Sequence, residues 1–231
     1  MGFMHDTMGS PFRCLIPPHC PHRGPPQPSP EFFMRRSQFF VLASALLTAG
    51  LASFWFLNTS RAATETPEYT VIRSTAPFEI RDYPELNLVT SPMEADGMNG
   101  GFRTLFGFIT GGNQAGAKIA MTTPVLVDNT TPQKRMSFIL PKGTAQAGVP
   151  RPLDGEVKLG KQPPARYAVF RFEGGRSAQN EKNAIEKLQA WMAAQDIKST
   201  GTPILAYYDP PWTPVFLRRN EVLIRIKKPR E

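Results

Sequence analysis

Histidine and cysteine are absent from residues 64–231, because every residue of both types lies among the first 22. This absence excludes disulfide bonds, histidine ligation of a metal, and histidine- or cysteine-based catalysis from that part of the chain. The remaining carboxylates form no catalytic arrangement. Glu79 and Asp82 are three apart in an alternating segment and point to opposite faces, and Asp209 precedes two prolines in a turn. We therefore expect a non-enzymatic protein without a metal site.

A glycine-rich phosphate loop is also missing, since the glycine pairs at 100–101 and 111–112 bracket a helical pattern. The net charge is +8, with basic residues gathered near the C-terminus: Arg218, Arg219, Arg225, Lys227, Lys228 and Arg230. Aromatic residues are not interleaved with these charges, so we expect no nucleic-acid partner. We interpret the cluster as a solvated strand edge protected against pairing. An anionic ligand or a membrane surface is the alternative.

Residues 1–33 are expected to be a disordered extension, because 11–30 are rich in proline and cannot pack. The cysteines and histidines within them match no structural zinc spacing. The sequence Met34-Arg35-Arg36 is the more credible start of the natural protein, in which case 1–33 would not belong to it.

Residues 39–57 carry no charge and follow two arginines. Their length matches the roughly 20 residues of one membrane crossing, and the basic flank predicts a cytoplasmic N-terminus. We expect a signal anchor over 34–60 that tethers the rest, through a linker at 61–67, on the extracytoplasmic (periplasmic) side. A cleaved secretory signal is the alternative, since Ser60 and Ala62 are small residues of the kind that signal peptidase reads.

The first half of the remaining chain shows alternation typical of strands at 69–73, 118–127 and 135–140, and at 77–83, which Pro84 interrupts and 86–90 resume. A helix is predicted over 96–109. Its apolar residues fall on one stripe: Met98, Phe102, Leu105, Phe106 and Ile109.

The second half repeats this order with strands at 157–159, 167–172, 203–208 and 221–226. Ser177 is expected to cap its helix, and 143–152 form a loop between the halves. The segments 118–125 and 207–222 occupy the same place in each half. Strand, strand, helix, strand, strand in both halves predicts an internal repeat and an α+β, barrel-like sheet packed against two helices.

Four ordered segments carry a resemblance to a known family: FEIRDYP at 78–84, FRTLFGFI at 102–109, KIAMTTPV at 118–125, and DPPWTP at 209–214 followed by RNEV at 219–222. With these segments, residues 68–228 resemble the SOUL heme-binding protein family. The resemblance implies a distorted eight-stranded antiparallel β-barrel flanked by two helices and built from a pseudo-twofold internal repeat.

The resemblance also implies binding of heme or a related tetrapyrrole in a shallow apolar groove beside the first helix. The candidate groove residues comprise an apolar wall for the macrocycle and two cations for the propionates: Met98, Phe102, Arg103, Phe106, Lys118 and Met121. Some members of the family have a histidine, proposed as an iron ligand, where this chain has Asp82. We therefore expect loose, apolar heme binding without histidine ligation.

Two other functions fit the same barrel. One is an envelope scaffold that uses it for protein interactions. The other is binding of a different planar apolar ligand, an apolar cation or a lipid, for which Glu79 or Asp82 would be the inward acidic residue. The sequence indicates no particular oligomeric state.

Overall fold

The computed structural model describes residues 40–48, 64–93, 97–129 and 133–228. The chain divides into two units, Met1–Phe54 and Trp55–Glu231. In the first unit, residues 40–48 are helical and their side chains are exposed. No helix within the described ranges is long and apolar enough to cross a membrane. The rest of the predicted transmembrane segment and the predicted disordered extension lie outside the described residues, so the anchor remains a prediction from the sequence alone.

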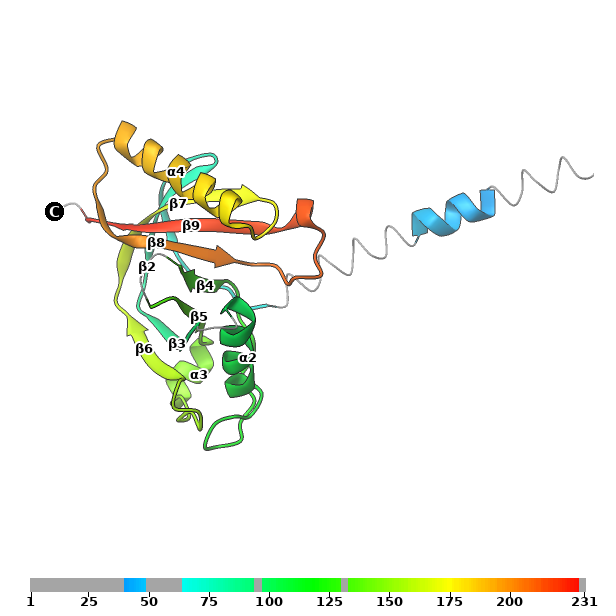
Figure 1. Ribbon diagram of the computed structural model, residues 1–231, viewed down its shortest axis with the longest axis vertical. Helices are drawn as coiled ribbons and strands as arrows, with labels where there is room; N and C mark the ends of the chain where they lie inside the picture. The colour runs from blue at the N-terminus through cyan, green and yellow to red at the C-terminus, as the bar shows by residue number, and fades with distance from the viewer. Residues whose placement is uncertain (1–39, 49–63, 94–96, 130–132, 229–231) are drawn as a thin grey trace, which may run out of the picture. The chain divides into compact units, whose positions relative to one another are not determined.

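The second unit is an α+β domain built on one antiparallel sheet of nine strands, in the order β1-β2-β7-β9-β8-β4-β5-β3-β6 (Figure 1). The strands are β1 (Thr70–Thr75), β2 (Phe78–Tyr83), β3 (Leu86–Pro92), β4 (Val125–Asp128), β5 (Arg135–Ile139), β6 (Lys158–Gln162), β7 (Ala165–Glu173), β8 (Ser199–Tyr207) and β9 (Arg219–Ile226). The order is open, with β1 and β6 at the two ends. The prediction of a closed eight-stranded barrel is therefore corrected to an open sheet of nine strands.

The ninth strand arises at Pro84, where we expected one interrupted strand. In the structure β2 pairs with β1 and β7, whereas β3 pairs with β5 and β6. Proline has no backbone N–H to give to a ladder, so the chain leaves one part of the sheet at Pro84 and enters another at Leu86.

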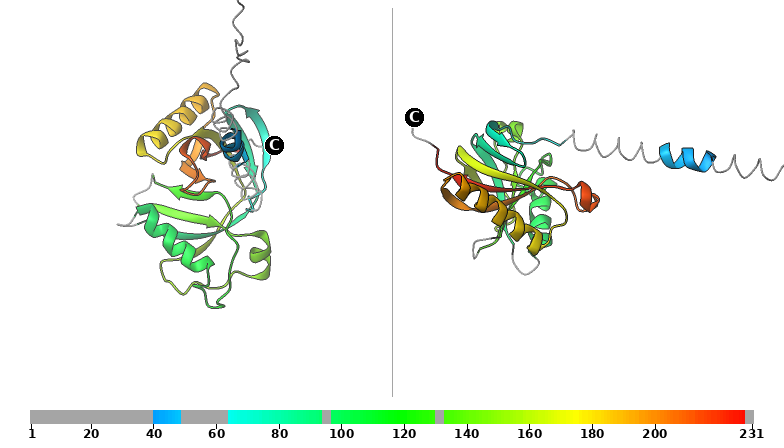
Figure 2. Two further views of the ribbon diagram at one scale, coloured as in Figure 1. Left: turned by 90° about the vertical axis from the view of Figure 1, so that its right-hand side faces the viewer. Right: turned by 90° about the horizontal axis from the view of Figure 1, so that it is seen from above.

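Two long helices pack against the sheet (Figures 1 and 2). Helix α2 (Gly97–Ile109) packs on β3 and β5, and α4 (Ala178–Ala194) packs on β7 and β9. Both predicted helices are confirmed. The predicted cap is also confirmed, since the Ser177 hydroxyl accepts a hydrogen bond from the Asn180 backbone N–H. A short helix α3 (Lys142–Ala147) corrects the prediction of a loop over 143–152, and a 3-10 turn η1 (Val215–Leu217) was not predicted.

Residues 118–124 are not a strand, which corrects the prediction of one strand over 118–127. Their alternation matches a strand, but their backbone bonds go to separate partners: Ile119 N–H to the Ile109 carbonyl, and Thr123 N–H to the Glu65 carbonyl. The Thr122 hydroxyl donates to the Ile139 carbonyl at 2.5 Å. Tertiary contacts thus hold this segment without a regular ladder.

The strand order has a symmetry of connectivity. Without β1, the strand order is β2-β7-β9-β8-β4-β5-β3-β6. If β2 is exchanged with β6, β3 with β7, β4 with β8 and β5 with β9, the same order results, read from the other end. Strands β4 and β8 pair at its centre. This is the connectivity that the predicted pseudo-twofold repeat requires. The repeat itself stays a prediction, because connectivity alone does not show that the halves superpose.

The prediction that the C-terminal basic residues lie on a sheet edge is wrong. Strand β9 pairs with both β7 and β8 and is central to the sheet. Arg225, Lys227 and Lys228 are exposed at its end, and Arg230 lies outside the described residues. The edge strands are β1 and β6.

Two hydrophobic clusters lie on opposite faces of the sheet. The larger includes the buried residues of α2 and α4, such as Leu105 and Leu188. The smaller holds Tyr83, Leu126, Val169 and Leu223. Because successive side chains of a strand point to opposite faces, each central strand contributes to both clusters.

The second face also buries a charged cluster centred on Arg81, whose side chain is fully buried. Its guanidinium donates two hydrogen bonds of 2.8 Å to Glu221 and one of 2.7 Å to Glu79. It also lies 4.3 Å from the centre of the Tyr69 ring, and the Tyr208 hydroxyl donates to Glu221. Both buried carboxylates therefore have partners, as burial of charge demands.

Candidate functional site

Helix α2 keeps two aromatic side chains on its outer face. Phe102 is 39% exposed and Phe106 is 46% exposed, and their rings stack with centroids 5.7 Å apart. Phe102 also meets Phe138 of β5 edge to face at 5.4 Å. Leu105, Phe108 and Ile109 of the same helix are buried. Exposed paired aromatics of this kind mark binding surfaces more often than isolated apolar residues do.

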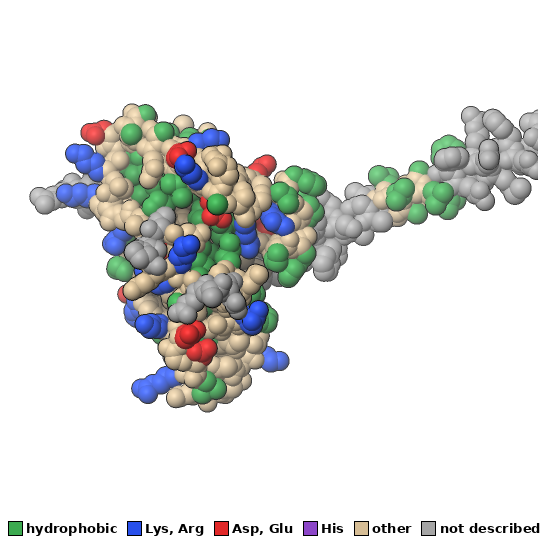
Figure 3. All heavy atoms as spheres, in the orientation of Figure 1, with side chains coloured by type: hydrophobic (Ala, Val, Ile, Leu, Met, Phe, Trp, Pro, Cys, Tyr) green, Lys and Arg blue, Asp and Glu red, His purple; other side chains and the backbone are tan. Residues whose placement is uncertain are grey.

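A row of paired residues continues from this aromatic pair across the sheet. Val125 of β4 lies opposite Phe138 on one side and opposite Tyr207 of β8 on the other. Neighbouring strands are about 4.8 Å apart, so the row from Phe138 to Tyr207 spans roughly 10 Å. All three residues belong to the face that carries α2 and α4. Figure 3 shows hydrophobic side chains in a recess of the surface between the α4 side and the α2 side.

The α4 end of this row is polar. The Tyr207 hydroxyl donates a 2.6 Å hydrogen bond to Glu181, which also accepts one from Asn129. Burial is the main cause that raises the pKa of Tyr207, and the hydrogen bond to Glu181 adds to it. The Tyr207 hydroxyl therefore stays protonated. The Arg176 guanidinium lies 4.4 Å from the centre of this ring. The row therefore runs from an aromatic end at Phe102 to a cationic end at Arg176, and its own members Phe138 and Tyr207 are each only 2% exposed.

The predicted groove residues fall into two groups. Phe102, Phe106, Arg103 and Lys118 are exposed. Met98 and Met121 are half-buried against the core beneath α2. The structure brings Phe102 and Phe106 together as a stacked pair.

Few residues of the domain remain as candidate iron ligands. Met93, Met136, Tyr83 and Tyr167 are buried. Burial raises the pKa of both of these tyrosines, which disfavours the phenolate that iron would need. The thioethers of Met98 and Met121 are half-buried and therefore more accessible as weak ligands.

Asp82 does not join the groove residues. Its carboxylate accepts hydrogen bonds of 2.7 and 2.8 Å from Arg166, and the hydrogen bond from Arg166 holds its pKa below the ordinary value. In sheet order, four strands separate β2 from β5, on which α2 packs. The position of the family's proposed histidine is thus used here for an ion pair.

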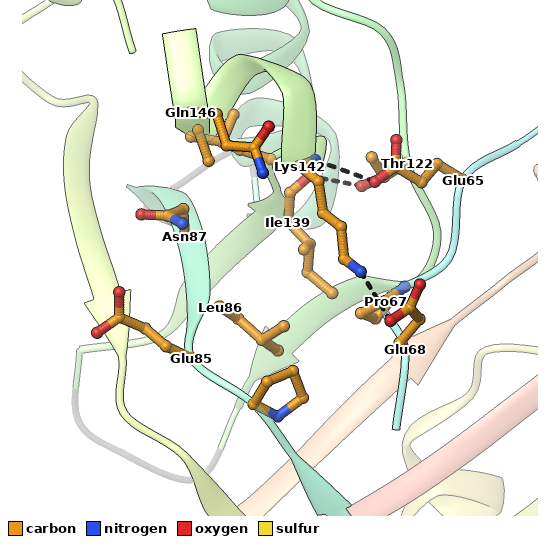
Figure 4. Close-up of a pocket in the computed structure, with 13 residues that line it drawn as sticks. Glu65, Pro67, Glu68, Glu85, Leu86, Asn87, Thr122, Ile139, Lys142 and Gln146 are labelled. Atoms are coloured by element: carbon orange, nitrogen blue, oxygen red, sulfur yellow. Dashed lines mark hydrogen bonds and ion pairs between the residues drawn. The ribbon is translucent and has the colours of Figure 1, made fainter. Parts of the chain in front are cut away.

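A separate cavity of about 290 Å³ lies at the second face, between the segment before β1, the β2–β3 connection and α3 (Figure 4). None of the predicted groove residues lines it. Lys142 contacts Glu68 at 2.7 Å and Glu85 contacts Lys161 at 2.8 Å. The third carboxylate of the lining, Glu65, accepts a hydrogen bond from the Lys142 backbone N–H. Each charged side chain of the lining therefore already has a partner in the protein.

Sequence reasoning missed Tyr207, Glu181 and Arg176 as part of the surface. Tyr207 begins the segment 207–222 described above, at the end of a predicted strand. Arg176 and Glu181 flank the predicted cap of α4. Only the register of β8 against β4 shows that these residues continue the row from α2.

The structure thus defines an α+β protein with an open antiparallel sheet and an exposed aromatic pair on helix α2. The chain belongs to the SOUL heme-binding protein family, whose model, described as SOUL heme-binding protein, matches residues 64–225. This match confirms the resemblance seen in the sequence. A comparison with curated proteins finds no match.

The chain is distantly similar to several solved structures. The C-terminal domain of EcmrR is 12% identical, with 69% of this chain and 98% of that chain covered and a TM-score of 0.49. A hydrolase from Listeria innocua is 9% identical, with 68% and 94% covered and a TM-score of 0.47. SAV2435 bound to tetraphenylphosphonium is 14% identical, with 69% and 94% covered and a TM-score of 0.38. Likenesses this distant carry no functional argument for this chain.

Proposed function

We propose that this protein is a non-catalytic binding protein for heme or a related tetrapyrrole, which it holds on the surface between α2 and α4. The observation that carries the proposal is the stacked, exposed pair Phe102 and Phe106 in a member of a heme-binding family. A porphyrin is planar and apolar over most of its area, and offset stacking on aromatic rings suits it.

Beyond the aromatic pair, the half-buried Val125 would contact the macrocycle, and the buried Phe138 and Tyr207 would support it from beneath. Arg103 and Lys118, exposed on and after α2, are the proposed partners of the propionates. Iron would receive no histidine from residues 64–231, which contain none. Binding would therefore rest on apolar contacts and be loose and reversible, which suits a carrier or scavenger.

The test is a hemin titration of the full chain, followed at the Soret band, against the double variant Phe102→Ala and Phe106→Ala. We expect saturable binding at one equivalent in the parent chain. The double variant should bind about 30-fold more weakly, because each substitution removes roughly 1 kcal/mol of apolar contact. A parent chain without saturable binding would refute the proposal.

Ile72→Ala provides the matched control. Ile72 is 47% exposed, close to the 46% of Phe106, but it lies on the edge strand β1. Its substitution should leave hemin affinity unchanged. Equal weakening by Ile72→Ala would show that hemin adsorbs to exposed apolar side chains in general.

We further propose that the apolar segment 39–57 tethers the domain to a membrane on its extracytoplasmic side. The support is the uncharged length of the segment and the arginines that precede it. Protease treatment of intact spheroplasts should digest the domain. Protection until the membrane is broken would place it on the other side, and release in soluble form would favour the cleaved signal.

A further inference from the structure

The β8–β9 loop, residues 208–218, exposes more apolar surface than its length would suggest. Trp212 is 79% exposed, Val215 is 51%, Phe216 is 73% and Leu217 is 37%. Figures 1 and 2 show η1, which holds three of these residues, at the outer end of the β8–β9 ribbon, away from the body of the sheet. The groove and the charged cluster described above do not account for this display.

The loop holds these side chains in a built conformation. Arg218 donates hydrogen bonds to the carbonyls of Thr213 and Pro211. Thr213, which is buried, donates its backbone N–H to the Pro210 carbonyl. Arg176 donates to the Asp209 carbonyl from outside the loop. Because the backbone is fixed by these contacts, little conformational entropy is lost when the exposed side chains bind something.

Three guanidinium groups, those of Arg176, Arg218 and Arg219, lie in or against the loop with two carboxylates, those of Asp209 and Glu173, so positive charge exceeds negative charge by one. Asp209 is buried, and its carboxylate turns inward to the backbone N–H and guanidinium of Arg219. Arg218 donates to backbone carbonyls, which carry no charge to balance its own. Glu173, opposite Arg219 in the register of β7 and β9, is the exposed carboxylate on the neighbouring strand.

We infer that the β8–β9 loop is a lipid-contacting element that inserts Trp212, Val215 and Phe216 into the interface of an anionic membrane, with Arg218 and Arg219 at the headgroup phosphates. Tryptophan and phenylalanine beside arginine are the side chains that favour this interface. A convex loop offers no pocket for a rigid partner, whereas a lipid surface deforms around it. The positive charge beside the apolar side chains selects anionic headgroups.

The experiment follows the fluorescence of Trp212 in the full chain. Trp55→Phe and Trp191→Phe leave Trp212 as the only one of the three tryptophans. The probe is a set of vesicles of phosphatidylcholine with phosphatidylglycerol whose acyl chains are brominated. We expect a shift of Trp212 emission to shorter wavelength and quenching by bromine. Phe216→Ala should weaken this partition about tenfold.

A matched control separates insertion of the loop from mere proximity to the bilayer. The control keeps Trp55→Phe and Trp191→Phe and adds Trp212→Phe and Leu153→Trp. Its single tryptophan then occupies a position that is 68% exposed in another loop. This reporter should be neither shifted nor quenched. Equal quenching at both positions would overturn the inference, because the tether alone would then explain it.

Two further results would overturn the inference. One is an unchanged Trp212 spectrum in anionic vesicles, or an equal response in pure phosphatidylcholine. The other is a short-wavelength emission of Trp212 in the protein alone that disappears on dilution, which would assign the loop to contact between two copies of the chain. None of these outcomes depends on hemin, so the inference stands or falls apart from the proposed function.

Discussion

Replacing Arg81 with methionine should destabilise the domain more than any other single charge removal proposed here. The substitution leaves the carboxylates of Glu79 and Glu221 buried, at 8% and 5% exposure, without the guanidinium that donates to both. Removing one partner of a buried ion pair typically costs about 3–5 kcal/mol. Urea unfolding at neutral pH, followed by circular dichroism, measures the loss.

The pH dependence of this loss gives a second check. Burial alone would raise the pKa of Glu221, but the hydrogen bonds and charge of Arg81 outweigh it and hold the pKa below its ordinary value of 4.5. In the parent chain this stability is present above pH 4.5 and is lost as the pH falls through the lower folded value. In Arg81→Met the remaining burial should raise the pKa of Glu221. Acid would then relieve the variant, and the difference between the two proteins should narrow as the pH falls.

Two variants test whether the buried pair is the cause. Arg171 also contacts both carboxylates, but its side chain is 53% exposed, so Arg171→Met should cost less than about 1 kcal/mol. Adding Glu221→Gln to Arg81→Met should recover part of the loss, because the amide still accepts from Tyr208 and carries no charge. If Arg81→Met and Arg171→Met cost the same, or if the double variant is no better than Arg81→Met, the reasoning is refuted.

Three other predictions concern local structure. Ser177→Ala should cost about 1 kcal/mol by removing the cap of α4, and Ser177→Thr should restore most of it in thermal unfolding. Gly112→Ala should lower the melting temperature, because a Cβ there would lie 2.8 Å from the Gly107 carbonyl oxygen. Gly107→Ala is the control, since a Cβ at that position meets no atom within 4 Å. Equal melting temperatures of the two variants would contradict this prediction. Asp82→His should leave the Soret spectrum of added hemin unchanged, because position 82 lies on β2 beside Arg166 and four strands separate β2 from β5. A new low-spin spectrum would contradict this prediction.

The helices and most strands could be predicted because their apolar spacing records which face is buried. The stripe of α2 and the cap of α4 are local features of the sequence, and both were found within one residue of their observed limits. The segment 118–124 could not be placed in this way. It alternates like a strand, yet its partners are Glu65, Ile109 and Ile139, which are distant in sequence.

The charged cluster illustrates a different limit. Glu79 and Arg81 are two apart in a strand and so share a face with Tyr83, a pattern that the sequence displays. The second carboxylate that Arg81 binds, Glu221, lies 140 residues further along the chain. Only the strand order β2-β7-β9 brings it near Arg81. The aromatic half of the candidate site was predictable from the helix. The half at Tyr207 was not, because it depends on the register between β4 and β8.

The most direct test of the proposed binding surface is to locate a bound porphyrin by NMR. Gallium protoporphyrin IX is diamagnetic, so backbone amide shifts can be followed in the labelled full chain as it is added. We predict the largest shifts in α2 around Phe102 and Phe106, with further shifts at Val125 and Tyr207. Shifts confined to the cavity of Glu65 and Lys142, or to β2 around Asp82, would contradict the account.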